Sequence, residues 1–236
     1  MAQTIYIADD DEHILEMQQV FLANAGFTVN AFPTGDNLFA AFESQPCDLV
    51  ILDVMMPGSD GLTICKKIRE ISTVPIIMLT AKESEMDYIT GLALGGDDYL
   101  FKPFSPSMLV MRCKALLRRA GMVAEERAQK GDSLKWGDLE TSMRTRRIVC
   151  GERDGTLTGT EFELLRVLIE ENGQPVSRGD LLRRVWGIDA AVETRVTDET
   201  VRRLRKKLMA VSSRLAIKAV WGYGYCLEDP DENPAH

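Results

Sequence analysis

Apolar and polar positions in the first half of the chain alternate between two periods. Apolar runs of strand length recur at residues 4–8, 27–32, 48–53, 74–80 and 97–101. Segments with helical spacing lie between and after them, at 12–26, 35–44, 61–71, 84–95 and 105–119. Five strands that alternate with five helices predict an α/β fold, a five-stranded doubly wound parallel sheet over residues 1–120.

The pattern changes after a polar stretch at residues 121–133, which we interpret as a linker. Short strand-like segments at 134–140 and 146–151 precede three helical segments, at 157–173, 177–187 and 196–211. Thr158 and Glu161 form a capping box at the start of the first helix, and Ser177 is the expected N-cap of the second. Residues 216–228 predict two strands around a Gly-Tyr-Gly turn. We expect an α+β winged helix-turn-helix domain at 134–228 and an acidic tail at 229–236.

Composition narrows the class of protein. The 236 residues suffice for two domains, no apolar run approaches a membrane span, and the N-terminus does not resemble a secretory signal. A cytoplasmic location is therefore expected. The five cysteines are scattered without a CxxC pair and there are only two histidines, so a zinc site is not expected.

The net charge of −8 conceals a local basic stretch. Residues 195–214 hold seven basic and two acidic side chains. Such a stretch is either a solvated helix face or a surface for nucleic acid. Val201, Leu204 and Leu208 supply an apolar stripe that would dock the helix and leave its basic face to a partner.

Polar residues gather where the predicted strands of the first domain end. Asp9 and Asp10 follow the first strand, Asp53 the third, Thr80 the fourth and Lys102 the fifth. Each has an ordinary explanation alone, as a turn, a strand end, a helix start or a surface lysine. Ligand sites in such sheets lie at the carboxyl ends of the strands, and five such residues at one edge favour a site.

The chemistry of this set suits phosphoryl transfer. Three carboxylates repel one another unless a cation neutralises them, and oxygen ligands without histidine or cysteine suit Mg²⁺. Lys102 could hold a phosphoryl oxygen, and Thr80 adds a hydroxyl. Asp53 is then a plausible nucleophile that forms an aspartyl-phosphate.

Several short motifs occur together in one order. The set IADDD, LDVMMPGSDG, MLTAK and DDYLFKPF resembles the receiver domain of two-component response regulators. The set LTGTEFELL, VRRLRKKL and GYGY resembles the DNA-binding domain of the OmpR/PhoB family. The resemblance covers nearly the whole chain except the linker and the tail.

The resemblance implies a role for each residue of the site. Asp53 would accept phosphate from a sensor histidine kinase. Asp10, Asp53 and the backbone carbonyl of Met55 would bind Mg²⁺, with Asp9 helping through water. Thr80 and Lys102 would hold the phosphoryl group, Tyr99 would change rotamer with it, and the bond from Lys102 to Pro103 would be cis.

Members of the family dimerise through a surface that this chain alters. Asp97, Asp98, Arg112 and Arg119 match the ion-pairing residues of that surface. Tyr88 and Met108 replace a usual basic–acidic pair, and Ala93 stands where an acid is common. We predict a more apolar dimer face whose association resists salt; the alternative is that Tyr88 and Met108 are simply exposed.

Two further departures concern the lifetime of the signal. Met55 and Lys82 stand where other receivers can place an amide or acid that orients the hydrolytic water. Neither side chain offers a good hydrogen-bond acceptor for that water, so slow autodephosphorylation is expected.

The resemblance also suggests which residues contact DNA. This set comprises Arg195, Asp198, Glu199, Thr200, Arg202, Arg203, Arg205, Trp221 and Tyr223. Glu199 and Thr200 replace a usual apolar residue and a usual histidine, so the preferred DNA sequence should differ from the commonest family sites. Trp221 stands where the family often has an arginine that reaches the minor groove, and it either makes another kind of contact or packs on Tyr223 or Tyr225.

Together these features predict a phosphorylation-controlled regulator of transcription. It would form a homodimer when phosphorylated, bind double-stranded DNA at two half-sites, and have RNA polymerase as a further partner. It would not be a conventional enzyme. One alternative is a Mg²⁺-dependent phosphohydrolase, although Met55 stands where such enzymes have a second aspartate. The other is a regulator whose receiver serves only as an unphosphorylated dimerisation module.

Overall fold

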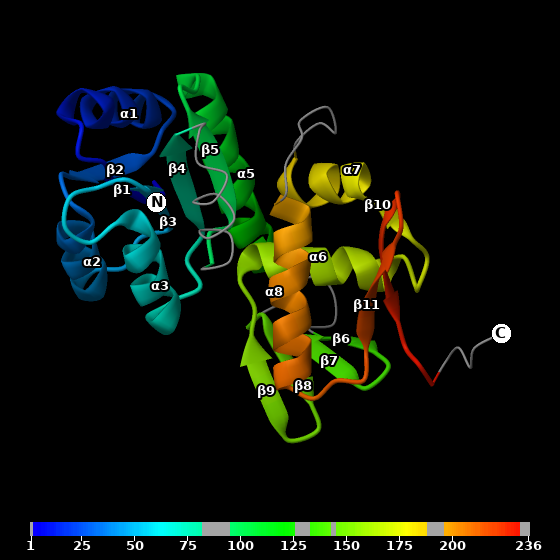
Figure 1. Cartoon of the computed structure of the whole chain (residues 1–236). Coiled ribbons are helices and arrows are strands. Elements are labelled where there is room, and N and C mark those ends of the chain that lie inside the picture. The colour runs from blue at the N-terminus through cyan, green and yellow to red at the C-terminus, as the bar shows by residue number, and fades with distance from the viewer. Residues whose placement is uncertain (1, 82–94, 126–132, 143–144, 188–195, 232–236) are drawn as a thin grey trace. The chain divides into compact units, whose positions relative to one another are not determined.

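The computed structural model describes residues 2–81, 95–125, 133–142, 145–187 and 196–231. The chain divides into two compact units, residues 1–117 and 118–236. Figure 1 shows the order of elements along each unit. No helix among the described residues is long and apolar enough to cross a membrane.

The first unit is a five-stranded sheet with the strand order β2-β1-β3-β4-β5, in which every pair is parallel. Its elements are β1 (Thr4–Ala8), α1 (Glu12–Asn24), β2 (Thr28–Phe32), α2 (Gly35–Ser44), β3 (Leu49–Asp53), α3 (Gly61–Ile71), β4 (Ile76–Ala81), β5 (Asp98–Lys102) and α5 (Pro106–Glu125). The order reverses at β1, so the predicted doubly wound fold is confirmed and its switch point lies beside the ends of β1 and β3.

The helices of this unit begin and end where the sequence supplies caps. The Asp11 side chain accepts hydrogen bonds from the first amides of α1, and Asp60 caps α3 in the same way. Gly26, expected to stop the first helix, has a φ of 96°, a left-handed conformation that favours glycine.

The apolar core on one face of the sheet is built from α1 and α5. Leu15 and Leu22 of α1 pack in one buried cluster with Leu109, Cys113 and Leu116 of α5 and with the strand residues beneath them. The alternation of strands with amphipathic helices therefore produces the layered packing that it predicted.

The second unit combines an antiparallel sheet with a winged-helix core. The sheet contains β6 (Ser133–Trp136), β7 (Leu139–Ser142), β8 (Arg147–Cys150) and β9 (Arg153–Thr156). The core contains α6 (Gly159–Glu170), β10 (Val176–Ser177), α7 (Arg178–Leu181), the π-helical segment η2 (Leu182–Trp186), α8 (Val196–Ala210), β11 (Ala216–Val220) and β12 (Gly224–Glu228). The capping box of Thr158 and Glu161 and the N-cap Ser177 are present as predicted.

Some boundaries differ from the sequence expectation. Strand β9 was not predicted, because the Arg-Asp-Gly-Thr segment lacks an apolar alternation and is held by pairing with β8. Helix α5 continues to Glu125, so the start of the expected linker at 121–133 is helical. The helix expected at 84–95 lies outside the described residues except for its last position.

Candidate functional site

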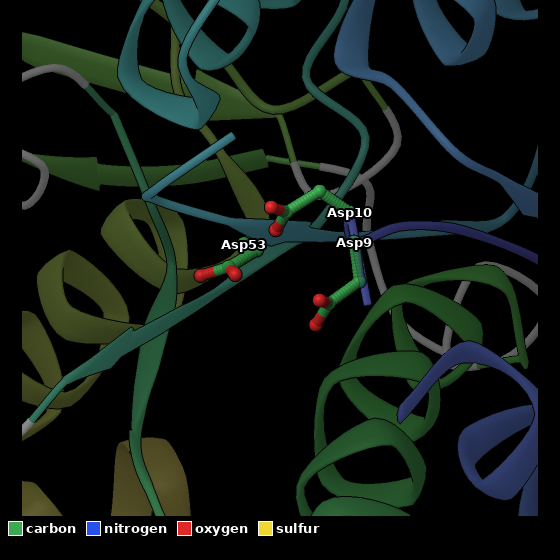
Figure 2. A group of neighbouring side chains, drawn as sticks. All are labelled: Asp9, Asp10 and Asp53. Carbon is green, nitrogen blue, oxygen red and sulfur yellow. The ribbon is translucent and has the colours of Figure 1, made fainter. Parts of the chain in front are cut away.

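Three carboxyl groups meet at the carboxyl end of the first sheet. Asp9 and Asp10 follow β1 and Asp53 ends β3, and these two strands are direct neighbours. One oxygen of each carboxyl group lies within 4.8 Å of the others (Figure 2). Asp9 and Asp53 are buried and Asp10 is exposed. The strand ends therefore bring together the three acids that the sequence singled out.

The start of α3 closes tightly over the end of β3. A Cβ atom at Gly61 would lie 2.0 Å from the backbone oxygen of Asp53, so a side chain at this position would collide with the strand. The amide of Gly61 also donates to the backbone oxygen of Val54 at 3.1 Å. Glycine at this position therefore helps to fix the backbone that carries Asp53.

Lys102 connects two of the three acids. Its Nζ donates to Oδ2 of Asp9 at 2.8 Å and to Oδ2 of Asp53 at 2.7 Å. The ammonium group comes from the far edge strand β5, and the bond from Lys102 to Pro103 is cis, as expected. The charge of Lys102 thus offsets the charges of two buried carboxylates, and its Nζ could donate a hydrogen bond to a group added to Asp53.

Burial and ion pairing act in opposite directions on these groups. Burial raises the pKa of Asp53 above its ordinary value, although the hydrogen bond and charge of Lys102 partly lower it. Burial tends to lower the pKa of Lys102, but its bonds to Asp53 and Asp9 outweigh this and raise the pKa. Lys102 is therefore charged at neutral pH, and Asp53 gains a proton more readily than an exposed aspartate.

The donor set fits a hard divalent cation. All three groups at the site offer carboxylate oxygens, and no thiol or imidazole is among them. Mg²⁺ prefers oxygen ligands and keeps several waters, which suits a site with one exposed member, Asp10. The residues present can hold such an ion, while the expected role of the Met55 carbonyl stays a prediction.

The other residues expected at this edge lie in different environments. Thr80 is the penultimate residue of β4 and has no exposed surface, and Tyr99 is buried on β5. Met55 is exposed, and its amide donates to Oδ1 of Asp53 at 3.4 Å. Because the exposed Met55 side chain lies two residues after Asp53, it is placed to influence water that approaches Asp53.

The acids expected on the dimer face are held inside the unit. Asp98 accepts two bonds from Nη1 of Arg112, at 2.8 and 2.9 Å, and both residues are buried. Asp97 is buried and accepts from Nη2 of Arg69 at 2.6 Å and from the amide of Ile76 at 3.0 Å. Sequence reasoning missed Arg69, since a basic residue near the end of an amphipathic helix gives no signal of a partner.

Apolar side chains are exposed on β5 and α5. Phe101, Met108 and Met111 are all exposed. Met108 and Met111 are three residues apart on one helix and so share a face. Strand β5 and helix α5 thus expose apolar side chains, while Asp97 and Asp98 are already paired with Arg69 and Arg112 within the unit.

Helix α8 carries most of the expected DNA contacts, and the structure corrects two of them. Thr200 has no exposed surface and donates to the backbone oxygen of Val196 at 2.8 Å. Arg203 is 7% exposed and lies 3.7 Å from the carboxylate of buried Glu161. The expectation that Thr200 and Arg203 contact DNA is therefore wrong for this arrangement, because both side chains face the interior of the domain.

Asp198, in the first turn of α8, is part of a polar cluster with α7 and β12. Its Oδ1 accepts from Nε of Arg178 at 2.9 Å and from the hydroxyl of Tyr225. The guanidinium of Arg178 lies 4.9 Å from the centre of the Tyr225 ring. Arg178, which directly follows the N-cap Ser177, was missed by the sequence analysis although it is basic and begins a helix.

The remaining cations of α8 are less enclosed. Arg202 is half-buried and pairs with Glu199 within the helix. Arg205 donates to the backbone oxygen of Ile217 and lies 5.7 Å from the Tyr225 ring. Lys206 is exposed. The contacts of Arg205 join α8 to the β11–β12 hairpin.

The two aromatic residues expected on the wing are exposed. Trp221 is 99% exposed and Tyr223 is 49% exposed. An indole with almost its whole surface in solvent cannot be packed on Tyr223 or Tyr225, so that alternative is excluded by the structure. Tyr225 is instead buried beside Arg178 and Arg205.

Some expected site residues lie outside the described part of the chain. These are Lys82, Tyr88, Ala93 and Arg195. Arg119 is on α5, but only its backbone is described. Their roles stay predictions.

Comparison with known families matches both units. Residues 5–131 match the response regulator receiver domain, and residues 152–227 match the C-terminal domain of transcriptional regulatory proteins. The receiver match alone covers more than half of the chain.

Individual relatives and solved structures agree with the assignment of the chain to these two domain families. The chain is 38% identical over 230 residues to the regulatory protein VanR of Enterococcus faecium, covering 97% of this chain and 100% of the relative. It is 37% identical over 239 residues to the alkaline phosphatase synthesis transcriptional regulatory protein PhoP of Bacillus subtilis, covering 99% and 100%.

Among solved structures, a mutant of RitR shares the fold with a TM-score of 0.78 at 21% identity, covering 97% of this chain and 100% of that one. Thermotoga maritima DrrB, an OmpR/PhoB homologue, is 31% identical with a TM-score of 0.50, covering 96% and 99%.

Proposed function

The chain belongs to the OmpR/PhoB family of two-component response regulators, which control transcription and are not conventional enzymes, and from this premise we propose that phosphorylation of Asp53 is its switch. A sensor histidine kinase would supply the phosphoryl group. The phosphorylated receiver would dimerise, and the dimer would bind two half-sites on double-stranded DNA and act on RNA polymerase. We place the receiver at residues 1–120, the linker at 121–133, the DNA-binding domain at 134–228 and an acidic tail at 229–236, with α5 extending into the linker as far as Glu125.

The placement of Lys102 carries this proposal. Its Nζ contacts one oxygen of Asp9 and one oxygen of Asp53, while Asp53 keeps its other oxygen, Oδ1, within 3.4 Å of the Met55 amide. A lysine that spans two buried acids at a predicted cation site is suited to hold the oxygens of a phosphoryl group.

The phosphoryl step follows from these positions. A carboxylate oxygen of Asp53 attacks phosphorus, and the bond from phosphorus to the donor atom breaks with its electron pair leaving on the donor. Lys102 and the Thr80 hydroxyl would contact phosphoryl oxygens, and Tyr99 on the neighbouring strand would reorient. Mg²⁺, held by Asp10 and Asp53 with Asp9 nearby, would neutralise charge on the phosphoryl oxygens.

Dimerisation would use the face of β5 and α5. The exposed side chains of Phe101, Met108 and Met111 support an apolar contact. Asp97 and Asp98 already bind Arg69 and Arg112 within the receiver, so fewer acids are left for ion pairs between protomers. Association of the phosphorylated protein should therefore depend little on salt, whereas a dimer held by ion pairs would dissociate as salt is added.

DNA binding would use the exposed part of α8 and the residues around it. Glu199, Arg202 and Arg205 would lie in the major groove with Arg195, and Arg178 would contact a phosphate. Asp198 is better explained as a positioning residue, because it holds Arg178 and Tyr225 together. Trp221 and Tyr223 would meet DNA from the hairpin tip.

The proposal is tested by size-exclusion chromatography with light scattering and by DNA binding, before and after treatment with Mg²⁺ and acetyl phosphate. We expect a monomer-to-dimer shift and tighter binding to a DNA fragment selected by the protein from a random library. Asp53→Asn should show neither change. Equal dimerisation and DNA binding with and without the phosphodonor would support instead a receiver that is an unphosphorylated dimerisation module.

A further inference from the structure

Two consecutive methionines follow the proposed phosphoacceptor by two and three residues, and their environments differ. Met55 is 64% exposed, whereas Met56 is 7% exposed. The methyl carbon of Met56 lies 3.1 Å from the position that a Cβ atom at Gly35 would take, at the start of α2. Met56 is therefore part of the core, while most of the Met55 side chain lies in solvent. A single exposed apolar side chain is common, so any function of Met55 must follow from its position.

The backbone of Met55 is held beside the carboxyl group that would carry the phosphoryl group. Its amide donates to Oδ1 of Asp53 at 3.4 Å. Asp10, which belongs to the same cluster of acids, is exposed, so this edge of the sheet borders solvent. Both the water that hydrolyses an aspartyl-phosphate and a small solute that reacts with the Met55 thioether therefore have access from solvent.

Oxidation changes what this side chain can do. A thioether sulfur is a weak hydrogen-bond acceptor, which is why slow hydrolysis is expected of the unmodified protein. A peroxide transfers one oxygen atom to a lone pair of the sulfur: the O–O bond breaks, the sulfur loses two electrons, and hydrogen peroxide is reduced to water. The resulting sulfoxide is polar, and its oxygen accepts hydrogen bonds well. That oxygen is separated from Cα by the same number of bonds as the side-chain oxygen of glutamine or glutamate.

We propose that Met55 is a site of oxidative modification, and that its sulfoxide shortens the lifetime of the phosphorylated state. The sulfoxide oxygen would accept a hydrogen bond from a water molecule and orient that water toward phosphorus. The water oxygen attacks phosphorus, the bond from phosphorus to the Asp53 oxygen breaks with its electron pair leaving on the carboxylate, and both protons of the water stay with the released phosphate.

This inference rests on the proposed phosphorylation of Asp53 and adds a second input to it. The kinase would set how fast the phosphoryl group is added, and a peroxide would set how long it stays. Methionine sulfoxide is reduced back to methionine by dedicated reductases, one for each epimer at sulfur, so the modification is reversible. Oxidation would therefore act as a reversible signal that ends the response.

The first test measures the lifetime of the aspartyl-phosphate in the full-length protein. The protein is treated with hydrogen peroxide and then with dithiothreitol, which reverses sulfenic acids and disulfides at cysteine but leaves sulfoxides in place. It is next phosphorylated with acetyl phosphate and Mg²⁺ and freed of the donor, and the loss of the phosphoryl mass is followed. We expect the oxidised wild type to lose the phosphoryl group roughly threefold or more faster than the untreated protein. Peptide mass spectrometry should locate an added oxygen on Met55 but not on buried Met56.

Variants separate Met55 from the other exposed methionines of the described residues, which are Met17, Met108, Met111 and Met209. Met55→Leu should make the lifetime insensitive to peroxide. Met209→Leu is the matched control and should respond as the wild type does, because Met209 is 76% exposed but lies on α8 in the second unit. Met55→Gln, which places an amide oxygen at the same bond distance from Cα, should shorten the lifetime without any oxidant. Treatment of the oxidised wild type with both sulfoxide reductases should restore the long lifetime.

The outcomes distinguish this inference from the function on which it rests. An unchanged lifetime in protein whose Met55 is oxidised, or faster hydrolysis that persists in oxidised Met55→Leu, would overturn the inference and leave the phosphorylation of Asp53 intact. So would peptide spectra in which Met55 stays unmodified while Met209 is oxidised. If the untreated wild type gains no phosphoryl group on Asp53 from acetyl phosphate or from a phosphorylated histidine kinase, the proposed function fails and this inference fails with it.

Discussion

Removing the charge of Lys102 should destabilise the receiver strongly in the absence of Mg²⁺. The Nζ atom lies 2.8 Å from Asp9 and 2.7 Å from Asp53, and the lysine side chain is only 23% exposed. At an effective dielectric constant of about 20, each contact carries roughly 6 kcal/mol of gross attraction, most of it offset by desolvation. Because Lys102→Met leaves two buried carboxylates together, we expect a loss of about 3–5 kcal/mol in the free energy of unfolding.

The loss should depend on pH in a defined direction. Burial already raises the pKa of Asp53, and loss of the lysine raises it further. The folded state of the variant then binds a proton more tightly than the unfolded state, so stability is lost as pH rises through the folded pKa. The variant should therefore be closer to the wild type at about pH 5 than at about pH 8.

The assay is urea unfolding followed by circular dichroism and by fluorescence. All three tryptophans lie in the second unit, at Trp136, Trp186 and Trp221, so a transition seen by circular dichroism alone belongs to the receiver. Lys67→Met is the matched control, because Lys67 pairs with exposed Asp36 at 3.4 Å and solvent screens the pair, so the free energy of unfolding should change far less at either pH. Equal effects of the two substitutions, or a loss in Lys102→Met that is unchanged at acid pH, would show that repulsion between Asp9 and Asp53 is not what destabilises the variant.

Three further results are expected. The initial rate of phosphorylation by acetyl phosphate, measured by intact mass, should fall as pH drops through the raised pKa of Asp53, since only the ionised carboxylate is a nucleophile. A rate that rises toward acid pH, after correction for ionisation of acetyl phosphate, would contradict this. Gln18→Met should raise the free energy of unfolding by about 1–3 kcal/mol. Gln18 is 1% exposed on α1, and neither polar atom of its side-chain amide has a hydrogen-bond partner among the described residues. A destabilised variant would argue against an unsatisfied amide. The aspartyl-phosphate should persist well beyond seconds, as followed by loss of the added mass. Met55→Glu should speed its hydrolysis by roughly tenfold or more. An unaltered rate of hydrolysis would show that Met55 does not limit the reaction.

The cluster of acids and lysine at the edge of the first sheet could be predicted largely from the sequence, because sheet topology determines where strand ends meet. Asp9, Asp53 and Lys102 each follow an apolar run, and a parallel sheet brings the ends of such runs to one edge. The acids Asp9 and Asp53 indeed lie together with Lys102 between them. What the sequence could not show is that a single lysine contacts both acids, since this depends on the length and path of one side chain.

The DNA-binding surface was less accessible to sequence reasoning. The basic run on α8 does not reveal which members turn inward, and the buried acid Glu161 of α6 draws Arg203 and Lys207 toward the interior. Arg178 is distant in sequence from Asp198, and their contact exists only because α7 and α8 are packed in one domain. Long-range partners of this kind leave no periodic signal along the chain.

Intact-mass and peptide mass spectrometry after incubation with Mg²⁺ and acetyl phosphate would show whether Asp53 is the phosphoacceptor. We expect a gain of one phosphoryl group located on Asp53, absent from Asp53→Asn and retained in Asp36→Asn, which alters an exposed acid away from the site. No gain in the wild type with either acetyl phosphate or a phosphorylated histidine kinase, or a gain that survives in Asp53→Asn, would contradict it.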